Sequence, residues 1–256
     1  MIEVADSTLV DALHPSANFG PRRDGARPSI LLLHYTGVAT AAKAISWLAN
    51  PASEVSCHYV VDEDGRITQM VAEEKRAWHA GAGSWAGIAD INSASIGIEI
   101  QNVGHEAGYP PFPKTQIAAV IALSREIIGR HGIRPERVLA HSDVAPKRKK
   151  DPGERFPWGE LAREGVGHWT DPVPGTEEDA GAGLGACGLA VAEAQALLAA
   201  YGYSIPRDGT LDRDTEFVIT AFQRHFRPAR VDGRLDASTM ATLQKLSAAL
   251  REAPRS

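Results

Sequence analysis

The sequence predicts an α/β body, a sheet with helices packed on it, followed by a small C-terminal three-helix module. Over residues 29–158, short apolar runs alternate with amphipathic stretches, which is typical of strands and helices that share one sheet. Residues 171–185 then concentrate proline, glycine and acidic side chains, a composition that keeps backbone solvated and poor in contacts. We therefore predict a first domain at 1–170, a linker at 171–185 and a helical domain at 186–256.

The first domain contains five predicted strands and two predicted helices. Compact or alternating apolar runs indicate strands at 29–34, 57–62, 66–71, 95–101 and 137–141. Helical periodicity indicates helices at 40–50 and 114–131. Asp64-Gly65 predicts a hairpin between the second and third strands, and Gly132 predicts the end of the longer helix.

The strand at 95–101 has two different faces. Its three isoleucines alternate with Gly97, Glu99 and Gln101. Since successive strand side chains point to opposite faces, the isoleucines share one face and the other three residues share the opposite one. Glu99 is therefore either solvated on an open face or directed into a cleft.

The helical domain contains a short internal repeat. DGTLDRDT at 208–215 recurs as DGRLDAST at 232–239. In each copy the Asp-Gly pair predicts a turn, the leucine can pack as a hydrophobic staple, and the second aspartate can cap a helix. Together with the alanine- and leucine-rich stretch at 189–201, the two copies predict three helices.

The composition excludes two classes of function. The 256 residues carry 27 lysine and arginine against 32 aspartate and glutamate side chains, a net charge of −5, so no broad basic surface serves nucleic acid. No apolar run approaches the roughly 18 residues of a membrane span. The first 20 residues lack the pattern of an export signal, which predicts a cytoplasmic protein. Cys57 and Cys187 are expected to be unpaired thiols.

Three residues form a candidate metal site. His34 and His141 each end a predicted strand, and Asp151 follows ten residues after the second. Two imidazoles and one carboxylate suit a catalytic Zn²⁺, which keeps a fourth position open for water. Spacing alone does not select them, because the chain has nine histidines and ordinary core or surface groups are the alternative. His58 is an equally plausible ligand by this criterion.

Two further residues are candidates for the chemistry itself. In a cleft beside a metal, Glu99 could take a proton from water and pass it to a leaving amine, with its pKa raised by partial burial. Lys149, two residues before Asp151, could stabilise the oxyanion that forms when water attacks a carbonyl. The alternative for Lys149 is a solvated basic run at 147–150.

Five separated segments together resemble a known family. They are LLLHYTG (31–37), HYVVDEDG (58–65), VAEEKRAWHAG (71–81), SIGIEIQN (95–102) and AHSDVAPKRKKDPGERFPW (140–158). In this order they resemble the zinc-dependent N-acetylmuramoyl-L-alanine amidases of the AmpD and AmiD type, the type 2 amidases. The resemblance implies that family's fold, a mixed sheet flanked by helices.

The resemblance also implies roles for single residues. His34, His141 and Asp151 would bind Zn²⁺, Glu99 would act as general base and acid, and Lys149 would stabilise the oxyanion.

Further residues would line the substrate cleft. Trp78 and His79 correspond to a family segment beside the cleft, so we expect both to contact substrate, the alternative being a buried aromatic and a satisfied histidine. Asn102 is a further candidate contact, and His58 becomes a structural or cleft-wall residue.

The implied reaction is hydrolysis of the amide between N-acetylmuramic acid, including its 1,6-anhydro form, and the L-alanine that begins the stem peptide. A muropeptide-binding sensor of the same fold and a zinc peptidase acting within the stem are the alternatives.

Through 192–203 and 221–226 the tail resembles a three-helix peptidoglycan-binding module. The expected partners are therefore peptidoglycan or its fragments, and the periplasm is the alternative compartment because AmiD-type enzymes usually carry an export signal.

Overall fold

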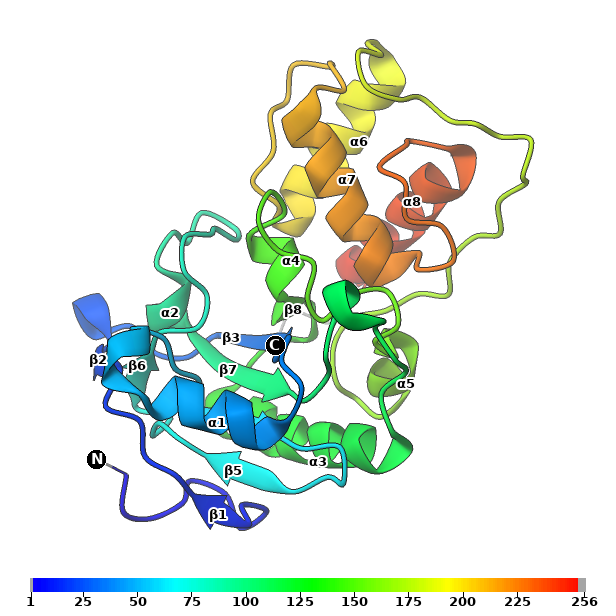
Figure 1. The fold of residues 1–256 in the computed structure, drawn as a ribbon. Helices are drawn as coiled ribbons and strands as arrows, with labels where there is room; N and C mark the ends of the chain where they lie inside the picture. Colours follow the sequence, from blue (N-terminus) through cyan, green and yellow to red (C-terminus); the bar gives the residue numbers. More distant parts are fainter. Residues whose placement is uncertain (1, 253–256) are drawn as a thin grey trace.

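The structure is a computed structural model that describes residues 2–252. Its strands are β1 (Ala12–Leu13), β2 (Phe19–Pro21), β3 (Ile30–Tyr35), β4 (Tyr59–Val61), β5 (Ile67–Gln69), β6 (Lys75–Ala77), β7 (Ser95–Ile100) and β8 (Val138–Ala140). Its α-helices are α1 (Ala41–Ala49), α2 (Ile91–Ala94), α3 (Lys114–His131), α4 (His141–Val144), α5 (Trp158–Arg163), α6 (Leu189–Tyr201), α7 (Arg213–Phe226) and α8 (Ala237–Glu252). Figure 1 shows the strands in one body, with α6, α7 and α8 as a helical region beside it.

Six strands form one mixed sheet in the order β1-β5-β4-β7-β3-β8. β3 is parallel to both β7 and β8, and β4 is parallel to β7, whereas β4 and β5 form an antiparallel hairpin. β2 and β6 form a separate antiparallel pair. The predicted α/β class, the mixed sheet and the hairpin are confirmed.

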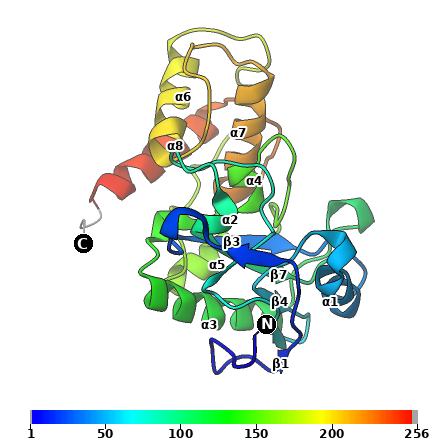
Figure 2. The ribbon, with the colours of Figure 1, turned by 90° about the vertical axis from the view of Figure 1, so that its left-hand side faces the viewer.

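The two faces of the sheet have different cover. The isoleucines of β7 and Leu31 and Leu33 of β3 pack with α3 in one buried cluster. Ile30 and Leu32 point to the opposite face of the sheet and belong to a second cluster that continues into α6 and α7. In Figure 2, α3 lies below the sheet and the helical region lies above it. The predicted alternation along 95–101 is confirmed, and Glu99 lies on the face opposite α3.

Several boundaries differ from the predictions. α3 ends as predicted at Gly132, whose φ is 63°. β8 ends at Ala140 and His141 begins α4, so the prediction that His141 ends a strand is wrong. The reason is that Asp143 Oδ2 accepts a hydrogen bond from Ala140 N at 2.8 Å, which turns the chain into the short helix. β1, β2 and β6 were not predicted, because each has only two or three residues and none lies in an apolar run like those that indicated the other strands.

The helical region follows the predicted repeat. Asp212 accepts a hydrogen bond from Thr215 N at 2.8 Å at the start of α7. Asp236 accepts one from Thr239 N at 2.7 Å at the start of α8. Each copy therefore caps a helix as the sequence predicts.

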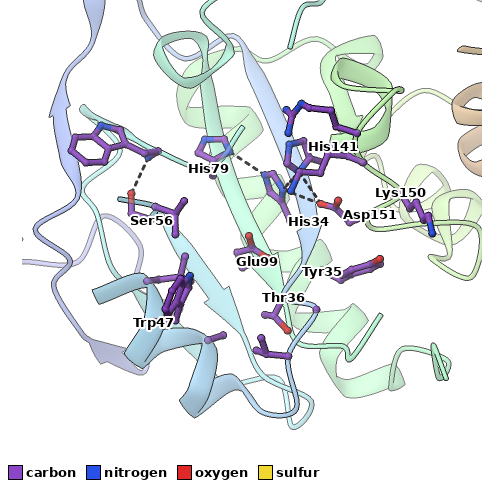
Figure 3. Close-up of a pocket in the computed structure, with 18 of the residues that line it drawn as sticks. His34, Tyr35, Thr36, Trp47, Ser56, His79, Glu99, His141, Lys150 and Asp151 are labelled. Atoms are coloured by element: carbon purple, nitrogen blue, oxygen red, sulfur yellow. Dashed lines mark hydrogen bonds and ion pairs between the residues drawn. The ribbon is translucent and has the colours of Figure 1, made fainter. Parts of the chain in front are cut away.

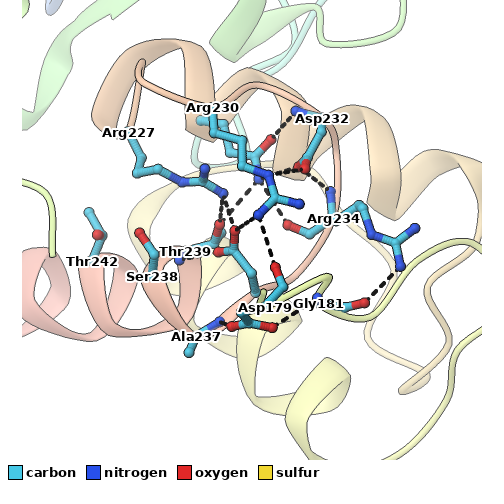
Figure 4. Close-up of polar contacts among 12 residues, drawn as sticks. Asp179, Gly181, Arg227, Arg230, Asp232, Arg234, Ala237, Ser238, Thr239 and Thr242 are labelled. Atoms are coloured by element: carbon cyan, nitrogen blue, oxygen red, sulfur yellow. Dashed lines mark hydrogen bonds and ion pairs between the residues drawn. The ribbon is translucent and has the colours of Figure 1, made fainter. Parts of the chain in front are cut away.

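The segment 171–185 packs along the helical region. Asp179 Oδ2 accepts a hydrogen bond from Ala237 N at 2.7 Å, and the Arg234 guanidinium donates to the Gly181 carbonyl at 2.8 Å, as Figure 4 shows. The expectation that this segment makes few contacts is wrong. Its oxygens accept hydrogen bonds from a backbone N–H at the start of α8 and from an arginine side chain. The predicted domain boundaries stay predictions.

Two further features bear on the composition. Cys57 is buried and Cys187 is exposed, and both are free thiols, as predicted. Among residues 2–252, no helix combines the length and the apolar character that crossing a membrane requires.

Candidate active site

Side chains from neighbouring parallel strands meet near their carboxyl ends. β3 and β7 pair with His34 opposite Glu99, and both side chains lie on the face away from α3. β8 pairs with the other edge of β3 and leads into His141. Asp151 comes from the loop after α4. The four residues line one cleft of about 460 Å³, and Figure 3 shows the two histidines and Asp151 side by side with Glu99 below them.

The three predicted ligands are brought together. The Nδ1 atoms of His34 and His141 are 2.9 Å apart, and Asp151 Oδ2 lies 3.1 Å from the first and 3.0 Å from the second. All three residues are buried. In a tetrahedral zinc site with bonds of about 2.0 to 2.1 Å, ligand atoms are separated by about 3.3 Å. The three atoms therefore fit one face of such a site closely, and we refer to these residues as the ligand trio.

A hydrogen bond at Nε2 of His141 leaves Nδ1 of the same ring available to bind a metal. His141 Nε2 lies 2.9 Å from the carbonyl oxygen of Ala80, so Nε2 carries the proton and donates. Nδ1 is left with a lone pair that points at the other two ligand atoms. A carbonyl partner of this kind orients metal-binding histidines in other proteins.

His34 is oriented by a longer relay. Ser95 Oγ donates to the Ile91 carbonyl at 2.7 Å, so the same oxygen accepts from His79 Nε2 at 3.2 Å. His79 Nδ1 is then an acceptor and receives the Nε2 proton of His34 at 3.0 Å. His34 Nδ1 consequently keeps its lone pair, as a metal ligand requires.

Gly97 makes room for this relay. A Cβ atom at Gly97 would lie 2.5 Å from His79 Nδ1, so a side chain there would displace the ring. Although His79 lines the cleft, both of its ring nitrogens bond to protein groups. The structure therefore favours a positioning role for His79 over the predicted contact with substrate. The sequence showed Gly97 and His79 but gave no sign that they touch.

Burial and neighbouring groups shift the pKa values of His34 and Asp151. Burial, with His141 next to it, lowers the pKa of His34 to about 4, which favours the neutral imidazole that binds metals. Burial acts to raise the pKa of Asp151, but the two histidines outweigh it and hold the pKa well below its ordinary value. The site therefore offers two lone pairs and one negative charge.

Glu99 has an unused oxygen beside the ligand trio. Glu99 Oε2 is buried and has no hydrogen-bond partner among the described residues. Burial, and then the charge of Asp151, raise the pKa of Glu99 well above its ordinary value, against the opposite effect of Lys149. A carboxyl group in this environment is placed to exchange a proton with a molecule in the cleft.

Cationic and aromatic side chains line the rest of the cleft. Lys149 lines it, and its positive charge acts on both His34 and Glu99. Trp78 also lines it, in agreement with the predicted position. Trp47 was not predicted to take part, yet it lines the cleft from α1 and is 57% exposed. A large apolar residue outside the buried stripe of its helix was the available signal.

Two predicted residues lie elsewhere. Asn102 is 2% exposed and does not line the cleft. Its Oδ1 accepts from Gly104 N and its Nδ2 donates to the Pro110 carbonyl, each at 2.9 Å. Both ends of the amide therefore hold the local loop, and the predicted contact of Asn102 with substrate stays a prediction. His58 accepts from Gly97 N at 2.9 Å and stays outside the ligand trio.

Comparisons with known proteins agree with this geometry. The sequence matches the N-acetylmuramoyl-L-alanine amidase family over residues 24–154 and the peptidoglycan binding domain family over residues 187–243. It is 41% identical over 243 residues to N-acetylmuramoyl-L-alanine amidase AmiD of Escherichia coli (strain K12), covering 86% of this chain and 82% of that protein. It is 30% identical over 168 residues to 1,6-anhydro-N-acetylmuramyl-L-alanine amidase AmpD of Enterobacter cloacae, covering 59% of this chain and 88% of that protein.

Solved structures share the fold. E. coli AmiD in complex with anhydro-N-acetylmuramic acid-L-Ala-D-γ-Glu-L-Lys has a TM-score of 0.73 and 38% identity, covering 88% of this chain and 91% of that one. AmpDh3 from Pseudomonas aeruginosa has a TM-score of 0.75 and 30% identity, covering 98% of this chain and 100% of that one. AmpDh3 in complex with anhydromuramic pentapeptide has a TM-score of 0.75 and 32% identity, covering 89% of this chain and 94% of that one.

Proposed function

The chain belongs to the N-acetylmuramoyl-L-alanine amidase family, and from that premise we propose which residues carry out its hydrolysis. The bond cleaved joins N-acetylmuramic acid to the L-alanine that begins the stem peptide of peptidoglycan. One observation supports the assignment most: three buried ligand atoms within 3.1 Å of one another lie beside a glutamate oxygen that has no partner in the described part of the chain. A protein that only binds muropeptides requires neither feature.

We assign Zn²⁺ to His34, His141 and Asp151. Two imidazole nitrogens and one carboxylate oxygen are the donor types of catalytic zinc sites, in which a fourth position stays open. When bound, Zn²⁺ supplies a Lewis acid that polarises a carbonyl and lowers the pKa of water towards about 7. Elemental analysis of the purified protein should give about one zinc per chain.

Glu99 and Lys149 complete the proposed chemistry. Glu99 accepts the proton of the attacking water through its free Oε2 and then delivers that proton to the nitrogen of the leaving L-alanine. Lys149 holds a positive charge where the carbonyl oxygen becomes negative. The buried trio and the tryptophans of the cleft limit the number of competing water molecules around the reacting amide.

Lys149 gives a direct test of these roles. Lys149→Ala should reduce kcat by about 10²- to 10³-fold while folding and zinc content are kept, because loss of one oxyanion donor has effects of this size. Lys147→Ala is the matched control, since Lys147 lies outside the cleft lining and pairs with Asp214 at 2.6 Å. Near wild-type turnover of Lys149→Ala on a muramoyl peptide would contradict the role.

We propose 1,6-anhydromuramoyl peptides as the substrates. The ligands solved with the AmiD and AmpDh3 relatives carry anhydromuramic acid. Incubation with anhydromuramoyl tripeptide should release the free tripeptide, which mass spectrometry identifies. Tight binding without product would favour a sensor, and cuts within the stem would favour a peptidase.

The domain division and the compartment stay predictions. The match to the peptidoglycan binding domain family supports a polymer contact for residues 186–256, and co-sedimentation with purified sacculi tests it. Fractionation of the producing cells distinguishes the predicted cytoplasmic location from the periplasmic alternative.

A further inference from the structure

The helical region and the catalytic sheet share one buried core. Leu32 of β3 and Leu139 of β8 belong to the same hydrophobic cluster as Leu198 of α6 and Phe222 of α7. Figure 1 shows α4 beneath α7, and the two helices are in direct contact. A module tethered only to bind polymer would not need such a continuous core.

Asp143 connects this interface to the ligand trio. It lies two residues after His141 and is 1% exposed. Its Oδ2 accepts from Ala140 N at 2.8 Å and from His225 Nδ1 at 2.7 Å, and its Oδ1 accepts from the Tyr203 hydroxyl at 2.6 Å. Two of its three donors therefore come from the helical region, and the third is the residue immediately before His141.

The donors from the helical region are themselves held in place. His225 is 2% exposed, and its ring stacks on Trp158 and Phe226 with centroid separations of 3.7 and 3.8 Å. The ring of Tyr203 packs edge-on against buried Trp85 at 4.7 Å. A buried carboxylate is stable only with such partners, so removal of either donor frees the turn that Asp143 closes.

We propose that Tyr203 and His225 are positioning residues for the metal ligand His141 and act through Asp143. The C-terminal helical region is thus a structural part of the catalytic site as well as a match to a wall-binding family. The inference rests on the proposed metal role of His141, because the group being positioned is its Nδ1.

Two tyrosines provide a matched pair of variants. Tyr203→Phe removes the hydroxyl that donates to Asp143. Tyr201→Phe removes a hydroxyl that is paired with His168 Nδ1 at 2.9 Å and, within residues 2–252, makes no hydrogen bond to Asp143. Both residues are buried in the same region, at 3% and 5% exposure. The two variants therefore make the same chemical change at sites that differ in their connection to the ligand trio.

The readout is zinc affinity of the full-length apoprotein, measured by competition with a chromogenic chelator. Tyr203→Phe should raise the zinc Kd by about three- to tenfold, and Asp143→Asn by about ten- to 100-fold, the range of partners that orient metal ligands. Tyr201→Phe should bind zinc as the wild type does. Thermal unfolding of each apoprotein shows that the variants are folded.

The outcomes separate this inference from the metal assignment. Zinc binding by the wild type with an unchanged Kd in Tyr203→Phe and Asp143→Asn would overturn the inference and leave the metal site intact. An equal loss in both tyrosine variants would indicate general loosening and would also overturn it. A wild-type protein that binds no zinc would overturn both.

Discussion

Two clusters of buried carboxylate and imidazole lie on opposite sides of the sheet and differ in how their oxygens are used. On the α3 side, Glu73 Oε1 accepts from the Tyr59 hydroxyl at 2.7 Å and from Arg130 at 2.8 Å, and Oε2 accepts from His131 at 2.6 Å. Burial acts to raise the pKa of Glu73, but His131, Arg130 and Tyr59 outweigh it and lower the pKa to about 2. We call these four residues the Glu73 cluster.

The cluster on the other side is arranged differently. Glu99 Oε2 has no partner among the described residues, and its pKa is raised by burial and by Asp151. The neighbouring histidines hold lone pairs towards one another rather than protons towards an acceptor. A buried carboxylate is therefore by itself weak evidence of function. An oxygen without a hydrogen bond, next to imidazole lone pairs that face one another, indicates a site that a bound group completes.

Glu99→Gln should show the largest effect on catalysis. The amide cannot take a proton from water, so kcat should fall by about 10²- to 10⁴-fold. Stability should be kept or rise, because the amide has nearly the same shape and Oε2 has no hydrogen bond to lose among the described residues. Turnover of anhydromuramoyl tripeptide and a thermal melt measure the two quantities. A rate within tenfold of wild type would remove the distinction between the two clusters.

Glu73→Gln should have the opposite pattern. It leaves the Arg130 guanidinium without its counter-charge, so the free energy of unfolding should fall by about 3 kcal/mol. The specific activity of the folded fraction should be kept. Glu74→Gln is the control, since Glu74 is 72% exposed and forms an ion pair with its neighbour Lys75. Urea unfolding compares the two. A stable Glu73→Gln variant with impaired catalysis would show that the Glu73 cluster serves the site.

His79→Leu should weaken metal binding without changing the ligand trio. The variant removes the acceptor for His34 Nε2, so the wrong nitrogen can carry the proton, and zinc affinity should fall by about ten- to 100-fold. Trp78→Phe keeps the relay and should leave the zinc Kd unchanged. Competition with a chelator measures both. An unaltered Kd in His79→Leu would mean that His34 needs no relay.

Acid should remove the stability that the Glu73 carboxylate contributes to the fold. A carboxyl group with a lowered pKa stabilises the fold above its ordinary pKa, and that stability is lost as the pH falls through the lowered value. The stability advantage of wild type over Glu73→Gln should therefore shrink as the pH falls from about 4.5 to about 2. Urea midpoints of both proteins at a series of pH values give the difference. An advantage independent of pH would show that the charge of Glu73 is not what stabilises the fold.

The sequence predicted the parts of the site that follow from the pattern of neighbouring residues. Alternation along 95–101 placed Glu99 opposite its isoleucines. The predicted ends of two strands drew attention to His34 and His141, although His141 begins α4. Local pattern could not exclude His58, because strand periodicity does not show which imidazole meets a carboxylate from a distant loop. The family resemblance, carried by five separated segments, made that choice.

Other contacts of the site could not be predicted from the sequence, because they join the side chains of residues that are far apart in it. Tyr203 and His225 reach Asp143 across separations of 60 and 82 residues, and no repeat or period links them. The loop contacts of Asn102 were missed for a related reason: the sequence does not show whether a polar residue after a strand faces a cleft or holds its own loop. Short edge strands were missed because pairing partners, rather than their own sequence, define them.

The most direct test of the metal assignment is an anomalous-scattering map from crystals grown with excess zinc. We expect one zinc ion bound by Nδ1 of His34, Nδ1 of His141 and a carboxylate oxygen of Asp151, with Glu99 beside the remaining position. Zinc bound elsewhere in the chain, or the three side chains turned away from a common centre, would contradict the assignment.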